Sequence, residues 1–413
     1  MPLSDKLSLG YALKTSPVYV AVFLMRFSFA FTVVALQYVI PSAIERGVIS
    51  SAYPIMEMLT GLFFGLLADR IGRKWITVGA LFASSIVSFS FTITRSFLPL
   101  VLIHGLQGVC AAAVITATLA SLTDLGKKET RGREMGFYDF CTIGGYGLGF
   151  VFALVLIDGN ASRSLLPFYA GSAVAVVGAL FSLFFLKDAK ISLVSQGTSA
   201  IASSVRKVLE NEKSLTLVAT WFVLTMLIGA GLTFTRELTS TLFHSTSIGF
   251  LGNSTQPTRI GAVLIALLIA GVVLLGFSQT TLGGLSDRFG RERLVLVGQV
   301  SIFGILVLLV LLLAFNLNRI AALPFVFLFG AGLLAFTPSG LAELADIAPE
   351  SGRGQTMGLY SFTVGAGTVF APLAGGELIS RYGSSEGFAI LFSIGIAIMG
   401  IVLIVRLQAR KDV

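Results

Sequence analysis

Twelve apolar segments, each about as long as a lipid bilayer is thick, constrain the fold of this chain more than any other feature. A membrane-spanning helix needs about 20 apolar residues. The segments are too long for strands and lack the alternation of apolar and polar residues typical of strands, so they predict helices. The chain is therefore expected to be an all-α membrane protein with twelve transmembrane helices. The segments cover residues 18–40, 49–68, 75–94, 97–122, 135–157, 165–186, 214–235, 260–283, 294–315, 320–342, 355–380 and 386–408.

The composition excludes a soluble protein. Of the 413 residues, 55% are hydrophobic and only 12% are charged, whereas soluble proteins carry about 25% charged residues. An enzyme is not expected, because the chain has two histidines and neither an HExxH motif nor a Gly-rich phosphate loop. For the same reason we expect no cofactor and no metal site.

The basic residues predict how the chain is oriented in the membrane. With the N-terminus inside, 21 of the 29 Lys and Arg residues fall in inner segments and 7 fall in outer loops. Loops rich in Lys and Arg stay in the cytoplasm, so both termini are expected there. The net charge of +8 then reflects topology, and the acidic partner it implies is the lipid bilayer. We expect a multi-pass, monomeric protein of the plasma membrane that binds a small-molecule solute and no nucleic acid.

A polar interval separates the first six segments from the last six. It predicts an N-terminal six-helix bundle at 1–186, a cytoplasmic linker at 187–213 and a C-terminal six-helix bundle at 214–413. Apolar residues within the linker lie on one face of a short amphipathic helix, which is expected to rest on the inner membrane surface. These residues are Ile201, Val205, Val208 and Leu209.

Two pairs of similar sequences show that the bundles arose by duplication. GLLADRIGRK at 65–74 returns as GGLSDRFGRE at 283–292, an offset of 218 residues. RGREMGFY at 131–138 returns as RGQTMGLY at 353–360, an offset of 222 residues. Because both pairs fall in equivalent loops, we interpret the chain as a repeated six-helix unit with an axis along the membrane normal.

The repeated loop also carries a family resemblance. The pattern G-x-L-x-D-R-x-G-R-[KR] between the second and third spans resembles motif A of the major facilitator superfamily. This resemblance implies two pseudo-symmetric six-helix bundles and a secondary transporter that works by alternating access. It also implies that a proton gradient, and not a bound cofactor, supplies the energy.

We expect the motif residues to form a conformational latch on the cytoplasmic side. Asp69 and Asp287 are placed where helix N-termini of the opposite half could approach, and the helix dipole favours a carboxylate there. The alternative is a set of solvated loop charges. The expected latch residues are Gly65, Asp69, Arg70, Gly72, Arg73, Asp124, Arg131, Asp287, Arg288, Gly290, Arg291, Asp346 and Arg353.

Two arginines of this latch have expected acidic partners. Arg73 is placed to reach Asp124 at the end of the fourth span. Its counterpart Arg291 is placed to reach Asp346 at the end of the tenth span. The second copy departs from the pattern, because Glu292 replaces the final basic residue.

Two charged residues lie near the middle of predicted spans, where charge is costly and indicates function. Arg26 lies in the first span and Glu57 in the second, at depths that differ by about 5 Å given the helical rise per residue. They could therefore pair across neighbouring helices. We interpret Glu57 as a proton acceptor that Arg26 tunes, or Arg26 as the group that holds an anionic solute. A permanent structural ion pair, or snorkelling of Arg26, is the alternative.

Two further residues are candidates for proton coupling. Asp139 lies near the cytoplasmic end of the fifth span, where it could titrate or form a salt bridge with Arg133 or another basic residue. His104 lies at a position where many superfamily members have an arginine, and it could act as a pH-sensitive imidazole or pack between helices.

A set of polar residues on the spans is expected to line the solute cavity. They could hydrogen-bond to a solute, although bonds between helices would use the same groups. The cavity candidates are Arg26, Gln37, Tyr38, Gln107, Gln279, Tyr360 and Thr363.

The direction of transport is indicated by two sequences that disagree. The Gly-Pro…Gly-Gly mark of superfamily antiporters is degraded in the fifth span, where Phe150 takes the place of the proline. RGREMGFY at 131–138 still resembles proton-linked exporters of drugs and metabolites. We therefore favour drug or metabolite:H+ antiport, with an organic-anion or sugar:H+ symporter as the alternative and a transporter-like nutrient sensor as a remote one.

Overall fold

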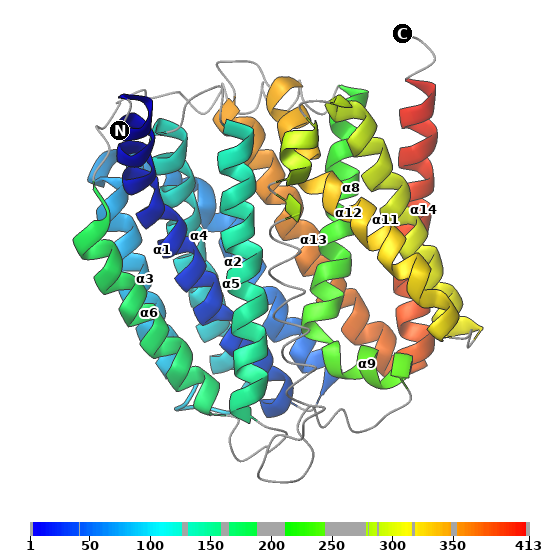
Figure 1. Ribbon diagram of the computed structural model, residues 1–413. Helices are drawn as coiled ribbons and strands as arrows, with labels where there is room; N and C mark the ends of the chain where they lie inside the picture. The colour runs from blue at the N-terminus through cyan, green and yellow to red at the C-terminus, as the bar shows by residue number, and fades with distance from the viewer. Residues whose placement is uncertain are drawn as a thin grey trace. The chain divides into compact units, whose positions relative to one another are not determined.

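Helices make up all of the regular structure in the part of the chain that the computed structural model describes (Figure 1). In that part, nine helices are long and apolar enough to cross a membrane. The predicted all-α class is therefore confirmed. The described residues are 3–40, 42–125, 131–157, 165–187, 211–243, 278–279, 281–286, 289–315, 319–347 and 353–409.

The helices agree with eleven of the predicted spans. A short helix, α9, follows α8 directly and was not predicted from the apolar pattern. Most of the predicted span 260–283 and the predicted linker helix lie outside the described residues. The helices are α1 (Leu3–Val39), α2 (Ala43–Ile71), α3 (Arg73–Ser90), α4 (Phe97–Leu125), α5 (Arg131–Ile157), α6 (Leu166–Phe185), α8 (Glu212–Thr233), α9 (Thr235–Phe243), α11 (Arg291–Ala314), α12 (Arg319–Ile347), α13 (Arg353–Tyr382) and α14 (Ser384–Gln408).

The described residues form two compact units. Unit 1 contains residues 3–39, 55–125, 131–157 and 165–187, and unit 2 contains residues 40, 42–54, 211–243 and those described from 278 onward. Helix α2 belongs to both units, because the division falls between Pro54 and Ile55. The predicted domain limits stay predictions, since most of the linker lies outside the described residues.

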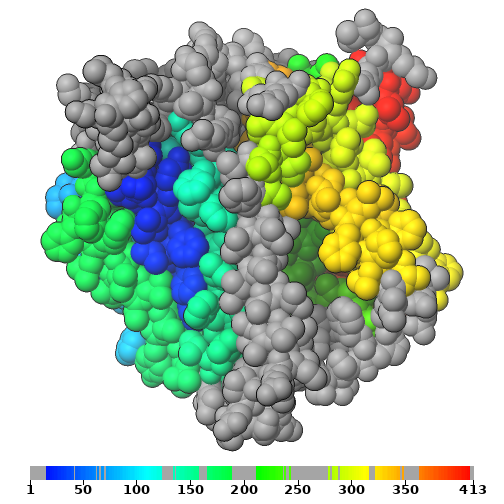
Figure 2. Space-filling view, in the orientation of Figure 1, coloured from blue at the N-terminus to red at the C-terminus, as the bar shows by residue number. Residues whose placement is uncertain are grey.

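Helix α1 lies at the centre of unit 1 and packs against α4, α5 and α6. The side chains of α1, α5 and α6 lie against one another in the space-filling view (Figure 2). Two glycines of α5 allow this approach: a Cβ atom at Gly145 would lie 2.6 Å from the carbonyl oxygen of Phe23, and one at Gly149 would overlap the carbonyl oxygen of Phe27. Small residues one turn apart let membrane helices approach closely. This contact brings Arg26 of α1 next to α5.

Unit 2 repeats the arrangement of unit 1. Helix α8 packs against α13 and α14 as α1 packs against α5 and α6, and α11 pairs with α12 as α3 pairs with α4. Glycines again allow the central contact: a Cβ atom at Gly229 would lie 3.2 Å from the Cα atom of Thr368, and one at Gly367 would overlap the carbonyl oxygen of Phe222. This recurrence of helix pairs is what a duplicated six-helix unit predicts.

The two copies of the repeated loop share an unusual backbone conformation. Gly72 directly precedes α3 with a φ of 103°, and Gly290 directly precedes α11 with a φ of 90°. Residues with a side chain rarely adopt a positive φ, whereas glycine does so readily. The turn therefore requires glycine at this position of the motif in both copies.

Candidate functional site

Arg26 and Glu57 form an ion pair within unit 1. The Nη2 atom of Arg26 on α1 lies 3.4 Å from the Oε1 atom of Glu57 on α2. The side chains are 13% and 26% exposed, so both are only partly buried. The two mid-span charges are thus neighbours, as their depths in the sequence indicated, and their role in proton coupling stays a prediction.

Tyr146 on α5 completes the surroundings of Arg26. The Nη1 atom of Arg26 lies 3.2 Å from the hydroxyl of Tyr146. The guanidinium carbon lies 5.0 Å from the centre of the tyrosine ring, within the range of a cation–π interaction. The small neighbour Gly145 makes this geometry possible, because a Cβ atom there would lie only 3.0 Å from the Cβ atom of Arg26.

A second tyrosine of α5 extends the polar cluster. The hydroxyl of Tyr138 lies 2.9 Å from that of Thr118 on α4, and the tyrosine is buried. Tyr138 also lies within electrostatic range of Arg26, Glu57 and Asp139. The predicted salt bridge of Asp139 with Arg133 or another basic residue stays a prediction, because the Arg133 side chain lies outside the described residues.

Sequence reasoning missed both tyrosines. Tyr138, Asp139 and Tyr146 all belong to α5. Tyr146 follows Asp139 by seven residues, or about two helical turns, so the two lie on the same face of the helix. A search for polar residues at helical spacing from Asp139 would have found Tyr146. Nothing in the sequence indicates that Tyr138 bonds to Thr118.

His104 lies in the interior of unit 1. The side chain is buried, and its ring lies edge-on to Phe91 with 6.0 Å between the ring centres. Phe91 in turn stacks on Phe168 of α6 at 5.1 Å. This environment favours the packing alternative for His104, and a role in proton coupling stays a prediction.

Gln107 ties three helices of unit 1 together. Its amide nitrogen on α4 lies 3.0 Å from the hydroxyl of Thr32 on α1 and 3.4 Å from that of Ser88 on α3. The side chain is buried, so these bonds favour a role between helices over contact with a solute. Gln37 is also buried and Tyr38 is half-buried, both near the end of α1.

The three cavity candidates of unit 2 differ from one another in their surroundings. Gln279 is buried, and its Oε1 atom accepts a hydrogen bond of 3.1 Å from Thr337 on α12. Thr363 on α13 lines a pocket, as described next. The side chain of Tyr360 lies outside the described residues.

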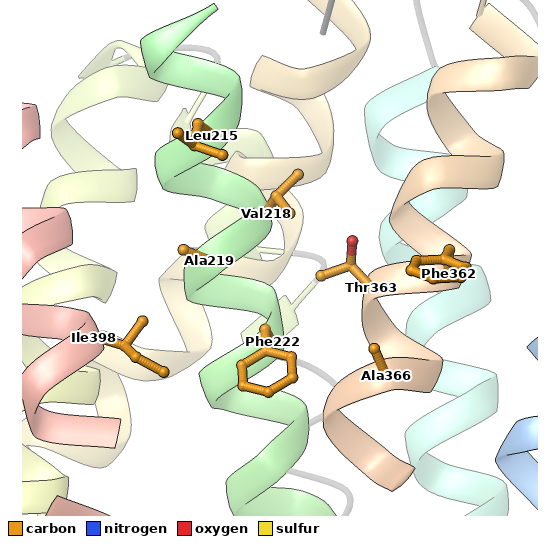
Figure 3. A pocket seen from close by; sticks show the side chains of 8 residues that line it. All are labelled: Leu215, Val218, Ala219, Phe222, Phe362, Thr363, Ala366 and Ile398. Carbon is orange, nitrogen blue, oxygen red and sulfur yellow. The ribbon is translucent and has the colours of Figure 1, made fainter. Parts of the chain in front are cut away.

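The pocket that Thr363 lines has a volume of about 310 Å³ and lies among α8, α13 and α14 (Figure 3). Among the described residues that line it, Thr363 is the one with a polar side chain. The other lining residues offer only hydrocarbon, so the pocket suits an aliphatic or aromatic group. The wall consists of Leu215, Val218, Ala219, Phe222, Phe362, Thr363, Ala366 and Ile398.

The arginines of the repeated motif bond to equivalent backbone positions. Arg73 donates to the carbonyl oxygen of Ala120 near the end of α4. Arg291 donates to that of Ala342 near the end of α12, at 3.1 Å. The offsets between the two copies are the 218 and 222 residues found in the sequence. Cations at the C-terminal end of a helix complement its unpaired carbonyls and its dipole.

The side chains of the expected acidic partners, Asp124 and Asp346, lie outside the described residues. The latch therefore stays a prediction. The latch residues whose side chains are not described are Asp69, Arg70, Asp124, Arg131, Asp287, Arg288, Asp346 and Arg353. The surroundings of Gly65 are not described either. Glu292, which replaces a basic residue of the motif, lies 3.5 Å from the Nζ atom of Lys213 at the start of α8.

Sequence reasoning missed a second buried ion pair. The Nη2 atom of Arg406 on α14 lies 2.5 Å and 2.7 Å from the two carboxylate oxygens of Glu343 on α12. The hydroxyl of Thr216 on α8 lies 3.4 Å from Nη1 of the same arginine. Both charged residues fall at the ends of predicted spans, where the sequence gives no reason to expect burial. The pair joins three helices of unit 2.

A family model for the Major Facilitator Superfamily matches residues 16–333 and 243–412. The chain belongs to this superfamily. It is 24% identical over 375 residues to "Multidrug resistance protein 2" of Bacillus subtilis (strain 168), with 90% of this chain and 88% of that protein covered. It is 22% identical over 362 residues to "Quinolone resistance protein NorA" of Staphylococcus aureus (strain COL), with 87% and 86% covered.

A solved structure of the superfamily shares the fold. The structure of a bacterial homolog of the human lysosomal transporter Spinster matches with a TM-score of 0.69, 13% identity, and 98% of this chain and 97% of that chain covered. The chain therefore has the twelve-helix fold of the superfamily, in two pseudo-symmetric six-helix bundles, as predicted. It is a multi-pass membrane transporter of small molecules and not an enzyme.

Proposed function

We propose that this transporter exports a small organic solute in exchange for protons. In this proposal it is a monomer in the plasma membrane with both termini in the cytoplasm, and the proton gradient drives it without a bound cofactor or a nucleic-acid partner. Two observations support export: the relatives above are named for multidrug and quinolone resistance, and RGREMGFY at 131–138 resembles the wording of proton-linked exporters.

The observation that carries proton coupling is the contact between Arg26 and Glu57. It is a single contact of 3.4 Å with a carboxylate that is 26% exposed. The pair of Arg406 and Glu343 has two shorter contacts and a carboxylate that is 11% exposed. A weaker and more accessible pair costs less to break. Glu57 is therefore the better candidate for a carboxylate that gains and loses a proton during transport.

The same cluster supports an exchange of proton and solute. When Glu57 is charged, its partly exposed carboxylate can attract a cationic group of the solute in competition with Arg26. When Glu57 takes up a proton, that attraction is lost and the solute is released. Binding of proton and solute would then exclude one another, as antiport requires.

The pocket of unit 2 supports a solute with an apolar part. Its wall is hydrocarbon apart from Thr363, and about 310 Å³ accommodates a ring system. We expect amphipathic solutes to bind better than sugars. The duplicated arginine–carbonyl contacts of Arg73 and Arg291 are assigned to conformational change and not to solute binding.

The experiment is transport by the purified protein in vesicles. A thermal-shift screen against amphipathic cations, carboxylates and sugars selects the solute, and its uptake is measured with an imposed pH gradient. Uptake driven by an acidic interior supports antiport, because protons leave as solute enters. Uptake driven by an alkaline interior contradicts it and supports symport.

Symport of an organic anion is the second candidate, and Arg26 favours it. Once Glu57 is protonated, the guanidinium keeps its charge next to Tyr146 and can bind a carboxylate. Proton and anion would then bind together. A selected carboxylate taken up only with an alkaline interior would establish this alternative. Measurable turnover of any solute would remove the remote alternative of a nutrient sensor.

A further inference from the structure

Two layers of polar side chains lie inside unit 2, near the helix ends that the predicted orientation places at the cytoplasm. The first layer is the buried pair of Arg406 and Glu343, together with the hydroxyl of Thr216. The second layer is a contact of 3.0 Å between the amide nitrogen of Gln299 on α11 and the hydroxyl of Thr220 on α8. Thr216 and Thr220 are one turn apart on the same helix, so the two layers are neighbours.

The amide oxygen of Gln299 needs a hydrogen-bond donor that Thr220 cannot supply. The hydroxyl of Thr220 donates its proton to the carbonyl oxygen of Thr216 in its own helix, at 2.6 Å. It therefore accepts from the amide nitrogen of Gln299 and has no proton for the amide oxygen. Gln299 is fully buried, and no described residue is a hydrogen-bond partner of its Oε1 atom. Buried polar atoms of this kind are normally bonded to protein or to ordered water.

The guanidinium of Arg406 offers the complementary group. Its two terminal nitrogens contact Glu343 and Thr216. Its Nε atom is a donor that has no acceptor among the described residues, and the side chain is 2% exposed. A buried donor left without an acceptor is costly. The first layer thus needs an acceptor where the second layer needs a donor.

Ser339 on α12 adds a third polar atom. It follows Phe336 by three residues and precedes Glu343 by four, so the three lie on one face of the helix. Phe336 meets both neighbouring helices: its ring centre lies 4.8 Å from that of Trp221 on α8, and a Cβ atom at Gly298 of α11 would lie 2.5 Å from its own. Ser339 is fully buried, and its hydroxyl has no partner among the described residues. This hydroxyl therefore lies where α8, α11 and α12 meet.

The chemistry of these atoms determines which ligand they fit. The Oε1 atom of Gln299 accepts a hydrogen bond, the Nε atom of Arg406 donates one, and the hydroxyl of Ser339 can do either. The charges of Arg406 and Glu343 cancel, so the arginine would repel a metal cation and the glutamate an anion. Water is uncharged, donates as well as accepts, and typically makes about three hydrogen bonds when it is buried in a protein. The site therefore fits water and not an ion.

The spacing of the two layers also fits a bridging water. Successive turns of a helix are about 5.4 Å apart, and two hydrogen bonds through one water span roughly the same distance, at about 2.8 Å each. We propose that unit 2 contains a buried water site that links the amide oxygen of Gln299 to the Nε atom of Arg406. The bound water joins α11 to α14, which pack against each other, and it bonds to Ser339 of α12. The site does not depend on the direction of transport or on the coupling ion.

The first experiment is X-ray footprinting of the full-length protein in lipid nanodiscs. X-rays convert a bound water into a hydroxyl radical, which oxidises the side chains beside it even where bulk water has no access. Phe336 and Phe392 are both fully buried in unit 2. Phe336 packs against the residue before Gln299, whereas Phe392 lies about 21 Å along α14 from Arg406. Phe336 is expected to be oxidised several-fold faster than Phe392, and equal rates would overturn the water site.

The second experiment repeats the footprinting on a variant without the acceptor. Gln299→Leu keeps a side chain of similar size but has no polar atom to hold water. Oxidation of Phe336 is expected to fall to the rate of Phe392. The matched control is Gln107→Leu, the same change at a buried glutamine of unit 1, which is expected to leave the oxidation of Phe336 unchanged. Undiminished oxidation of Phe336 in Gln299→Leu would show that Gln299 does not hold the water.

A double-mutant cycle tests the bridge to Arg406. Arg406→Lys keeps a cation for Glu343 but has no donor at the Nε position. If water connects the two side chains, either substitution removes the bridge, and the second then has less to remove. The fall in unfolding temperature of the double variant Gln299→Leu/Arg406→Lys is therefore expected to be smaller than the sum of the two single falls. Additive falls would mean that no water joins Gln299 to Arg406, and the proposal would be wrong.

Discussion

One nitrogen of Arg406, Nη2, lies within 2.7 Å of both carboxylate oxygens of Glu343. The arginine is 2% exposed and the glutamate 11%. Arg26 and Glu57 have one contact of 3.4 Å and are 13% and 26% exposed. The pair of Arg406 and Glu343 in unit 2 is thus closer and more deeply buried than the pair of Arg26 and Glu57 in unit 1.

Glu343→Gln is expected to destabilise the protein. The substitution leaves the charge of Arg406 buried among α8, α12 and α14, and breaking such a pair from one side costs about 3–5 kcal/mol. The measurement is thermal unfolding in detergent, with Glu377→Gln as the control at an exposed pair. Equal unfolding temperatures for the two variants would show that the buried pair adds nothing to stability.

The glycines of α5 give a test of helix packing. In Gly145→Ala the new Cβ atom would lie 2.6 Å from the carbonyl oxygen of Phe23 and 3.0 Å from Arg26. Because backbone has to shift, we expect a loss of about 1–3 kcal/mol, typical of overpacking. The control is Gly79→Ala on α3, where a Cβ atom meets nothing within 4 Å. A variant at Gly145 as stable as the control would contradict the close contact of α1 and α5.

The repeated turn gives a test of backbone conformation. A Cβ atom at Gly290 meets nothing within 4 Å, but the residue has a φ of 90°. Gly290→Ala is therefore expected to lose about 1–3 kcal/mol through backbone strain alone. Gly284→Ala has the same free space in a helix and is expected to be neutral or slightly stabilising. Thermal unfolding of the two variants checks this, and a neutral Gly290→Ala would count against the positive φ.

Tyr146 tests whether the surroundings of Arg26 affect transport. Tyr146→Phe removes the hydroxyl that lies 3.2 Å from Arg26 but keeps the ring. We expect a moderate rise in KM and a displaced pH profile, because Arg26 then interacts more with Glu57. Tyr146→Leu also removes the cation–π contact and is expected to raise KM further. If both variants match the unaltered protein, Tyr146 has no part in the site.

The fold could be predicted from the sequence because a helix that crosses a lipid bilayer needs a long apolar segment. Apolar length predicts a spanning helix, and the repeats at 65–74 and 283–292 relate the two halves. The pairing of Arg26 with Glu57 could also be predicted, since charges in mid-span are rare and depth follows from position along a helix.

The rest depends on which face of each helix meets which neighbour. Glu343 and Arg406 are 63 residues apart. They are buried because α11 and α8 each pack against both α12 and α14. Gln107 is a cavity candidate by sequence, and its bonds to Thr32 and Ser88 favour the alternative of a contact between helices. The rotation of a helix about its axis decides such cases, and the nearly uniform apolarity of the spans leaves that rotation undetermined in the sequence.

The central claim is that Glu57 couples transport to protons, and Glu57→Gln in proteoliposomes tests it most directly. We predict that this variant neither exchanges labelled for unlabelled solute across the membrane nor accumulates solute when the interior is acidic, because its neutral side chain lacks the charge that binds the solute. Glu377→Gln, the matched change at an exposed pair, is expected to do both. Accumulation by Glu57→Gln at the rate of the unaltered protein would contradict the account.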